Sequence, residues 1–469
     1  MKKSRILLVL LAALAAFLLV YSPHYHYSFP RHADEWHHIT ETMRLEGGGY
    51  SGKAIGLRVG FHILLWPLSK IADLVFVYKY FAAVWAAFSA LILFFVVYRK
   101  TEKNFFIALW AMVFFASIKS NVNITGLWFF TPLTFSIPLI YLYVYFFTEG
   151  IQKENKKLLL LSLSLMLVLL PLHALSVLFA FPFLFIYSLF NFQYIKKEWK
   201  FFSFFLVIPL AGMVFYKFMM RISWLSLAKN LTETLQFKRG WGILEVNNSL
   251  LELYSVIGYI LAIIGLLLIS IHRENFKKYL AYLLWPVSVF IFIIVYKICG
   301  VSYLVPYQRN LYYFAISLPF LSALGFSYLF KKIERASKGV AYIFVVLTIF
   351  FSFLFYWSIP EQINLYEAID AHDYQALLFL SRLPSSVVMA PPGISEALYP
   401  VSRHKPVATY IFYGNRKDSE TFFSTDDCSI RKQMIKKYDI RYVLSKSKID
   451  CGWKLIFDQG DYIYEIVAL

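Results

Sequence analysis

Charged residues are scarce in this sequence, and motifs of several common enzyme classes are missing. Only 16% of the 469 residues are charged, whereas 59% are hydrophobic and 20% are aromatic. This balance is too apolar for a soluble domain and indicates a polytopic α-helical membrane protein. There is no Walker loop, GxSxG or HExxH motif, so nucleotide-driven transport and the common soluble hydrolase chemistries have no support.

Acidic residues are the scarcer charge, with 28 against 46 basic residues and a formal net charge of +18. The basic residues recur in short clusters between hydrophobic segments, as orientation signals do. A nucleic-acid-binding protein would gather them on one soluble face, so no nucleic-acid partner is expected. Cysteine is also rare. A Cys428–Cys451 disulfide and a pair of free buried thiols are both compatible with the sequence, and Cys299 is left over in either case.

Hydrophobic windows long enough to cross about 30 Å of hydrocarbon predict about eleven membrane spans. The first resembles a signal peptide, but the residues after it lack a small-x-small cleavage site, which favours a retained span. The predicted spans cover residues 6–21, 75–98, 105–118, 127–147, 158–172, 175–189, 201–219, 250–271, 279–296, 311–330 and 340–357.

A basic loop follows each even-numbered span, which predicts the topology. Together with the basic N-terminus these loops fall on one side, and the positive-inside rule makes that side cytoplasmic. The external side then receives residues 22–74, residues 220–249 and the tail. Within the first external loop, the interrupted apolar stretch 60–74 is expected to lie in the membrane interface. The basic loops are residues 99–103, 153–157, 196–200, 273–278 and 331–335.

The composition changes abruptly after Trp357. Residues 1–360 are therefore expected to form a transmembrane domain that includes the first external loop, 22–74. Residues 361–469 are expected to form a small extracytoplasmic α/β domain. Its predicted elements are helices over 366–382 and 428–438, strands over 386–389 and 441–444, and a hairpin of 453–457 with 462–467.

An acidic pair, Asp34 and Glu35, follows the first span. Carboxylates close to a bilayer are costly unless they face water or a partner, so these two are the first candidates for chemistry. Pro30 and the polar residues after it predict a helix start, with Asp34 in the first turn and His38 one turn later. The helix dipole would keep Asp34 ionised and able to accept a proton. In the competing interpretation, the pair only solvates a helix end.

Polar side chains at the external ends of later spans are the next candidates. His173 faces a cavity or serves as a structural histidine. Arg309, beside Tyr307, suits a phosphate or pyrophosphate at the membrane boundary, and snorkelling to lipid headgroups is the alternative. The loop 221–249 is long enough to cover a cavity, and its cations and tryptophans suit an anionic sugar donor, although an interfacial aromatic belt explains the same residues.

Five histidines near the acidic pair raise the question of a metal, because imidazole and carboxylate groups bind zinc and manganese. Their spacing matches no defined ligand pattern, so we assign no metal ligand, and a divalent cation stays an open alternative. The histidines are His24, His26, His32, His37 and His38.

The order of these features resembles the GT-C class of membrane glycosyltransferases. That class includes protein O-mannosyltransferases, aminoarabinose transferases and oligosaccharyltransferases. The resemblance implies that Asp34 is the catalytic base or orients the acceptor, with Glu35 beside it. It also implies that His173 and Arg309 contribute to the substrate site, where we further place Tyr307 and His38. The tail lacks a Trp-Trp-Asp motif, so a sequon-reading oligosaccharyltransferase is not expected.

The implied reaction transfers a sugar from a polyprenyl-phosphate-linked donor to a hydroxyl of a lipid, glycan or protein at the outer face of the membrane. The donor arrives activated, so no nucleotide site is needed. A transporter or flippase of a lipid-linked glycan is the competing class, in which Asp34, His173 and Arg309 form a substrate or proton pathway. A noncatalytic subunit of a cell-envelope assembly is the third.

Overall fold

The computed structural model describes residues 3–45, 59–120, 126–219, 223–238, 250–271, 273–354, 356, 367–410 and 413–467. The chain divides into two compact units. We name Met1–Ser22 with Ala82–Pro360 the helical unit, and Pro23–Phe81 with Glu361–Leu469 the mixed unit. The first external loop thus groups with the tail, whereas the sequence-based division kept it with the transmembrane domain. Two predicted features lie outside the described residues. They are the domain boundary at 360, and residues 221–222 and 239–249 of the predicted covering loop.

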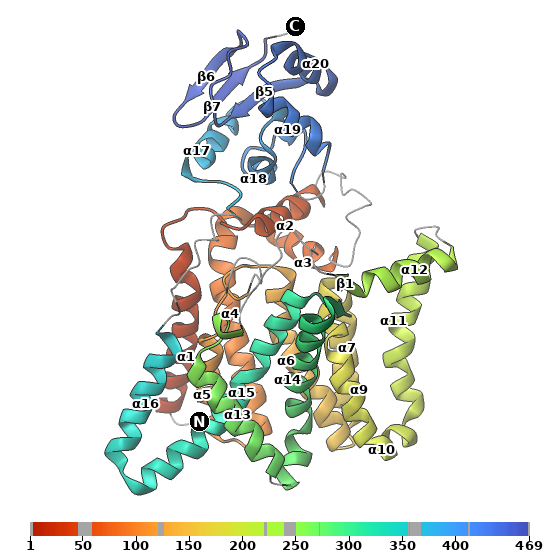
Figure 1. Cartoon of the computed structure of the whole chain (residues 1–469), viewed down its shortest axis with the longest axis vertical. Coiled ribbons are helices and arrows are strands. Elements are labelled where there is room, and N and C mark those ends of the chain that lie inside the picture. The colour runs from red at the N-terminus through yellow and green to blue at the C-terminus, as the bar shows by residue number, and fades with distance from the viewer. Residues whose placement is uncertain are drawn as a thin grey trace. The chain divides into compact units, whose positions relative to one another are not determined.

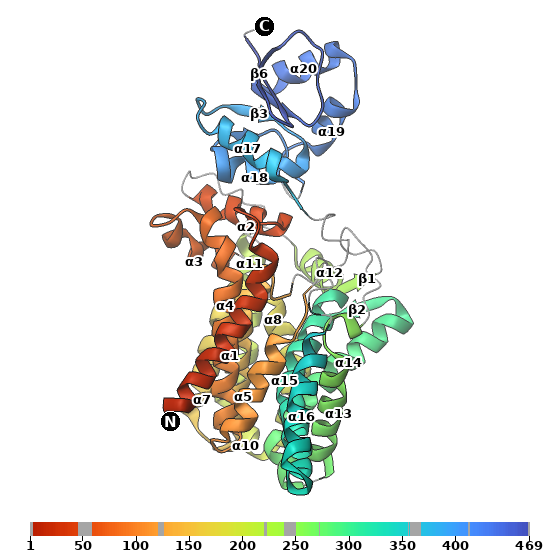
Figure 2. The same ribbon diagram turned by 90° about the vertical axis from the view of Figure 1, so that its left-hand side faces the viewer.

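Apolar helices make up the helical unit and run side by side in Figures 1 and 2. Six helices among the described residues are long and apolar enough to cross a membrane, and every predicted span overlaps at least one helix. The structure therefore confirms a polytopic helical fold. Its helices are α1 (Lys3–Tyr21), α4 (Leu74–Lys100, shared with the mixed unit), α5 (Phe105–Ala116), α6 (Pro132–Gln152), α7 (Lys156–His173), α8 (Leu175–Leu178), α9 (Ala180–Phe190), α10 (Phe192–Lys197), α11 (Trp199–Met219), α12 (Trp224–Thr234), α13 (Val256–Ile271), α14 (Arg273–Cys299), α15 (Tyr307–Ala336) and α16 (Lys338–Phe353).

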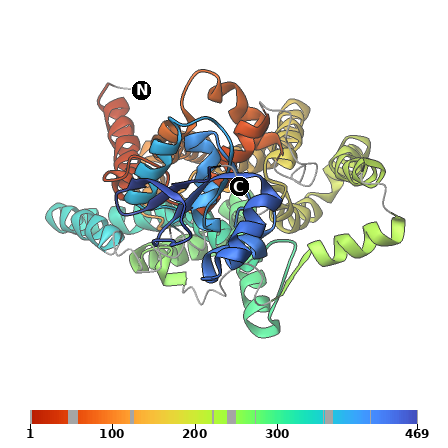
Figure 3. The same ribbon diagram turned by 90° about the horizontal axis from the view of Figure 1, so that it is seen from above.

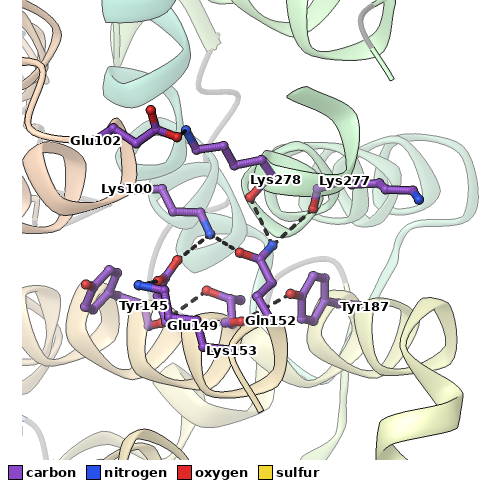
Figure 4. Close-up of polar contacts among 10 residues, drawn as sticks. Lys100, Glu102, Tyr145, Glu149, Gln152, Lys153, Tyr187, Lys277 and Lys278 are labelled. Atoms are coloured by element: carbon purple, nitrogen blue, oxygen red, sulfur yellow. Dashed lines mark hydrogen bonds and ion pairs between the residues drawn. The ribbon is translucent and has the colours of Figure 1, made fainter. Parts of the chain in front are cut away.

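A buried ion-pair cluster joins α4 to α6 (Figure 4). Lys100 is 3% exposed, and its ammonium donates to Glu149 Oε1 and to Gln152 Oε1, both at 2.6 Å. Lys153 holds the other Glu149 oxygen at 2.7 Å. The Gln152 amide in turn donates to the carbonyls of residues 277 and 278 at the start of α14. The end of α6 is thereby tied to two other helices.

Further ion pairs link the basic loops predicted from the sequence. Lys278 binds Glu102 at 2.6 Å, which joins loop 273–278 to loop 99–103. Lys197 binds Glu154 at 3.0 Å, which joins loop 196–200 to loop 153–157. These loops lie at one end of the helical unit, the end at which Figures 1 and 2 place α10 and the N-terminus of α1. These contacts therefore agree with the predicted alternation, in which the basic loops share one end of the bundle.

The late helices pack with little space between their backbones. A Cβ at Gly265 of α13 would come within 2.1 Å of the Leu321 carbonyl oxygen on α15, and one at Gly325 within 2.0 Å of the Leu261 oxygen. Only glycine permits this approach, as is common where membrane helices pack closely. A short antiparallel ribbon, β1 (Gln236–Lys238) with β2 (Val301–Tyr303), precedes α15.

The mixed unit contains two helices from the first loop and an α/β tail. The loop helices are α2 (Ala33–Arg44) and α3 (Val59–Ser69), and Figures 1 and 2 show α18 of the tail next to α2. The tail elements are α17 (Ala371–Leu380), β3 (Val387–Met389), α18 (Pro392–Ser402), β4 (Lys405–Pro406), α19 (Arg416–Ser424), α20 (Cys428–Tyr438), β5 (Ile440–Ser445), β6 (Lys454–Asp458) and β7 (Tyr462–Glu465).

The tail strands form one sheet in the order β4-β3-β5-β7-β6. Strand β3 is parallel to both β4 and β5, whereas β7 is antiparallel to β5 and β6. Figure 3 shows these blue strands beside α20. A disulfide joins Cys428 to Cys451, while Cys299 is free and exposed. The small α/β tail predicted from the sequence is present, and the structure selects the disulfide from the two cysteine alternatives.

Candidate functional site

The predicted acidic pair lies in the first turn of α2. His32 is the N-cap, and its Nδ1 accepts the backbone N–H of Asp34 at 3.0 Å. The Glu35 carboxylate accepts the backbone N–H of His32 at 3.3 Å, which completes a reciprocal capping box. Glu35 is fully buried, whereas Asp34 is half-buried. The two carboxylates therefore differ, because Glu35 caps the helix and Asp34 remains reachable.

The segment before α2 is tied to the start of the tail. The guanidinium of Arg31 binds Glu367, with Nε 2.8 Å from Oε1, and lies 4.0 Å above the Tyr27 ring. His32 also forms an antiparallel bridge with Glu367. These contacts span more than three hundred residues of sequence. They fix the backbone that enters α2, and therefore the direction of its first turn.

Most of α2 is buried, with α3 and α18 packed against it. His38 Nδ1 lies 2.9 Å from His62 Nε2 of α3, and both rings are buried. The Thr40 hydroxyl donates to the carbonyl of Glu396 on α18 at 3.0 Å. Trp36 is completely buried. His38 is thus part of a histidine pair one turn from Asp34.

A third carboxylate on α2, Glu41, lies close to the same helical face as Asp34 and His38. It is 3% exposed, and Arg44 donates to its Oε1 at 3.1 Å. Burial raises the pKa of Glu41, although Arg44 opposes that shift. Arg44 also lies 4.3 Å above the Tyr413 ring of the tail. Glu41 therefore belongs to the packing between the loop and the tail.

In the helical unit, His173 ends α7 within a network of hydroxyl groups. Its Nδ1 is 2.7 Å from the Ser176 hydroxyl and 3.3 Å from the Tyr313 hydroxyl. Ser176 further contacts Ser136 of α6 at 2.7 Å. All four side chains are buried. The network joins α6, α7, α8 and α15, and both hydroxyl contacts of His173 are made at Nδ1.

Arg309 lies one helical turn before Tyr313, in the first turn of α15. It is half-buried and acts electrostatically on both Tyr312 and Tyr313. The Asn310 amide donates to the Ser302 hydroxyl at 3.0 Å, which fixes the loop that enters the helix. Arg309 and His173 thus both interact with Tyr313.

Tyr307 begins α15 and lines a cavity. It is 3% exposed and stacks on Tyr296 with ring centroids 4.2 Å apart. Lys297 lies 5.2 Å above its ring. Tyr307 and Lys297 line a cavity of about 390 Å³. An apolar cavity of about 520 Å³ lies between α13, α14 and α15, and Leu250 and Phe290 line both cavities. We call the two neighbouring cavities together the groove.

The predicted site residues therefore fall into two groups, one in each compact unit. Asp34, Glu35 and His38 lie in α2 of the mixed unit. The residues His173, Arg309 and Tyr307 belong to the helical unit. Sequence reasoning did not assign roles to His62, Ser176, Tyr313 or Lys297. Of these four, only Tyr313 could have been connected to a predicted site residue from the sequence, because it stands four residues, or one helical turn, after Arg309.

The histidines of the first loop do not form a metal centre in the described part of the chain. Among those residues, no group of three or more His, Cys, Asp or Glu side chains is arranged to hold a metal ion. His32 caps α2, and His38 contacts His62. A divalent cation therefore receives no ligand set from these residues.

No family model matches the chain, and no curated protein matches it in sequence. Its fold is similar to that of the oligosaccharyltransferase AglB of Archaeoglobus fulgidus. The structure of that enzyme tethered to an acceptor peptide with the NVT sequon aligns with a TM-score of 0.56 and 13% identity, over 95% of this chain and 69% of that one. The complex with Zn and sulfate gives 0.55 and 13% over 94% and 68%.

A third structure of the same enzyme holds an inhibitory peptide and a dolichol-phosphate. It aligns with a TM-score of 0.53 and 13% identity, over 95% of this chain and 69% of that one. At this level of identity the likeness establishes the fold. It confirms the GT-C fold that the sequence predicted.

Proposed function

We propose that this protein is a membrane glycosyltransferase that transfers a sugar from a polyprenyl-phosphate-linked donor to an acceptor hydroxyl. The observation that carries the proposal is the likeness, over 95% of the chain, to an oligosaccharyltransferase whose structures hold an acceptor peptide in one case and dolichol-phosphate in another. The acceptor is a lipid, a glycan or a protein. Both partners of the proposed reaction thus have counterparts in proteins of this fold.

Asp34 is the proposed catalytic base. Its carboxylate is half-buried in the first turn of α2, where the helix dipole favours the ionised form. The acceptor oxygen would bond to the anomeric carbon while the bond from that carbon to the phosphate oxygen breaks. The acceptor's proton would pass to Asp34. Glu35 would support this step by holding the helix start, and His38 by packing against His62.

Arg309 is the proposed ligand of the donor phosphate. A cation in the first turn of a helix opposes the helix dipole by about 0.3–1 kcal/mol, so the position favours an anion close by. A phosphate there would interact with the guanidinium and with the N–H groups at the start of α15. Charge that develops on the leaving phosphate would be stabilised in the same way. The His173 and Tyr313 network would hold this turn in place.

The groove along α13, α14 and α15 supports a donor with an apolar chain. Its lining runs from Leu266 and Pro286 to Lys297 and Tyr307. Pro286 and Lys297 are eleven residues apart on α14, which corresponds to about 16 Å of helix, or roughly half of a bilayer's hydrocarbon thickness. An isoprenoid chain would fill the groove through one leaflet, with its phosphate at the cationic end.

The proposed topology has about eleven spans, a cytoplasmic N-terminus and an external tail. The linked basic loops at one end of the helical unit support this orientation. The Cys428–Cys451 disulfide supports an oxidising compartment for the tail. The proposed active face is therefore the outer face of the membrane. Because the described residues offer no three-ligand set, no step of the reaction is assigned to a metal.

The test is turnover of a polyprenyl-phosphate sugar by the purified full-length protein in lipid nanodiscs, with a panel of hydroxyl acceptors. We expect release of polyprenyl phosphate together with glycosylated acceptor. Asp34→Asn should lower turnover by orders of magnitude, whereas the exposed-site control Asp426→Asn should not. Near-normal turnover in Asp34→Asn would refute its role. Donor binding without release of polyprenyl phosphate, across the whole acceptor panel, would favour a transporter and refute the enzyme.

A further inference from the structure

The turn between β6 and β7 docks on the first turn of α17. His372 Nδ1 donates to the carbonyl of Gln459 at 3.2 Å. Gly460 has a φ of +94°, and a Cβ there would lie 2.5 Å from His372 Nδ1. The positive φ favours glycine at this position. The turn is thus fitted closely to the helix start, and Asp461 follows it directly.

Two buried carboxyl groups meet in this contact. Asp373 of α17 is 1% exposed and Asp461 is 2% exposed, and the two carboxyl groups lie close enough to act on each other electrostatically. Asp373 Oδ2 accepts the backbone N–H of Asp370 at 2.7 Å and the Lys446 ammonium at 2.8 Å. In the described part of the chain, Asp373 Oδ1 and Asp461 Oδ2 are buried oxygens without a hydrogen-bond partner. A proton on one carboxyl group would supply the missing donor, whereas two buried carboxylates this close would repel each other. The arrangement therefore favours one shared proton.

The surrounding charges do not remove this preference. Lys446 also binds Asp370 at 2.7 Å, so a single ammonium serves the carboxyl cluster from the end of β5. Burial raises the pKa of Asp461 to about 7, with the charge of Asp373 adding to the shift and Lys446 opposing it. Lys448 and Asp458, 3.8 Å apart, form a further charged pair near the turn.

This contact lies in the segment that leads to the start of α2. Asp370, the N-cap of α17, is three residues after Glu367, which binds Arg31 and pairs with His32. Tyr374, in the first turns of α17, packs on Phe29 with ring centroids 4.8 Å apart. Within the mixed unit, the first turn of α17 is therefore joined to the segment that caps α2.

We propose that Asp373 and Asp461 form a proton-operated latch that holds the β6–β7 turn on α17 and braces the connection from Glu367 to α2. While the pair shares a proton, the turn stays docked. When the proton is lost, two adjacent buried carboxylates repel each other, and the turn and the first turn of α17 open. The external domain would thereby sense the pH of its surroundings. This regulation is separate from the proposed sugar transfer.

The direction of the pH effect follows from linkage. The folded tail binds the proton more tightly than an opened segment, in which Asp461 returns to its ordinary value of 3.8. The stabilisation of the docked turn by this proton is therefore complete below pH 3.8, and it is lost as the pH rises through about 7. Between about pH 6 and about pH 8.5, the opening equilibrium should increase on the order of tenfold to thirtyfold.

Hydrogen–deuterium exchange of the full-length protein in nanodiscs tests the latch without an activity assay. Peptides that cover the first turn of α17 and the β6–β7 turn are compared at the two pH values, after correction for intrinsic exchange. Wild type should lose protection at the higher pH. Asp461→Asn should not, because its amide donates to Asp373 at both values. The exposed-site control Asp458→Asn should behave as wild type does.

Asp373→Asn provides a second route if Asp461→Asn does not fold, because its amide supplies the same hydrogen bond from the other side. It should also remove the pH dependence. Equal loss of protection in wild type and in a folded Asn variant would overturn the proposal, as would the absence of any loss in wild type. Full protection restored by Ca²⁺ at the higher pH would identify a cation site and overturn the proton latch.

Discussion

Glu35 and Asp34 are adjacent, but replacing them should have different consequences. Glu35→Ala removes the carboxylate that accepts the backbone N–H of His32 and so breaks the capping box. Loss of a helix cap costs about 0.5–2 kcal/mol, and we expect a loss of stability of about that size at the start of α2.

Glu35→Gln is the matched control, because its side-chain oxygen can still accept from His32. It loses only the interaction of a negative charge with the helix dipole, about 0.3–1 kcal/mol. Asp34→Asn keeps the backbone hydrogen bond to His32, since that bond uses the Asp34 N–H. The fold of α2 should therefore survive both amide substitutions.

The measurements are hydrogen exchange of α2 peptides and turnover of the lipid-linked sugar, on the same purified variants. Glu35→Ala should lose protection in α2, whereas Glu35→Gln should keep both protection and turnover. Asp34→Asn should keep protection and lose turnover by orders of magnitude. The reasoning fails if Glu35→Gln stays fully protected and yet loses as much turnover as Asp34→Asn, because Glu35 would then act chemically. Unchanged protection in Glu35→Ala would refute the capping role.

The other predictions concern topology, donor binding and the ion-pair cluster. In a variant that lacks Cys299, a cysteine introduced at the exposed Ser424 should react with an external thiol reagent. A cysteine introduced at Lys332 should not react. The reverse pattern would invert the proposed topology. Arg309→Lys should weaken binding of a polyprenyl-phosphate sugar. Arg309→Ala should weaken it about tenfold to a hundredfold, because a charge-assisted hydrogen bond contributes roughly 1.5–3 kcal/mol to binding. Unchanged affinity in Arg309→Ala would leave Arg309 as a membrane anchor. Lys100→Met should destabilise the purified protein by about 3–5 kcal/mol in thermal unfolding, because it leaves the Glu149 carboxylate without its buried partner. A Lys100→Met variant as stable as wild type would show that water reaches the cluster.

The sequence alone determined the class of fold and many of its elements. Apolar length is a local property, so every predicted span overlaps at least one helix. Capping is also local: the polar residues after Pro30 predicted a helix start with Asp34 in the first turn, and α2 begins at Ala33. In the tail, the hydrophobic periods predicted α17, α20, β3, β5, β6 and β7, but not α18, β4 or α19. These features depend on neighbours within a few residues, which a single sequence displays.

Only the tertiary structure decided which distant groups meet. Arg31 binds Glu367, Tyr313 contacts His173, and Asp461 contacts Asp373, and nothing in the local pattern of either partner identifies the other. The same holds for the choice of a disulfide over free thiols, and for the grouping of residues 23–81 with the tail. Such pairs depend on the path of the chain between them, and that path is set by the packing of all the intervening elements.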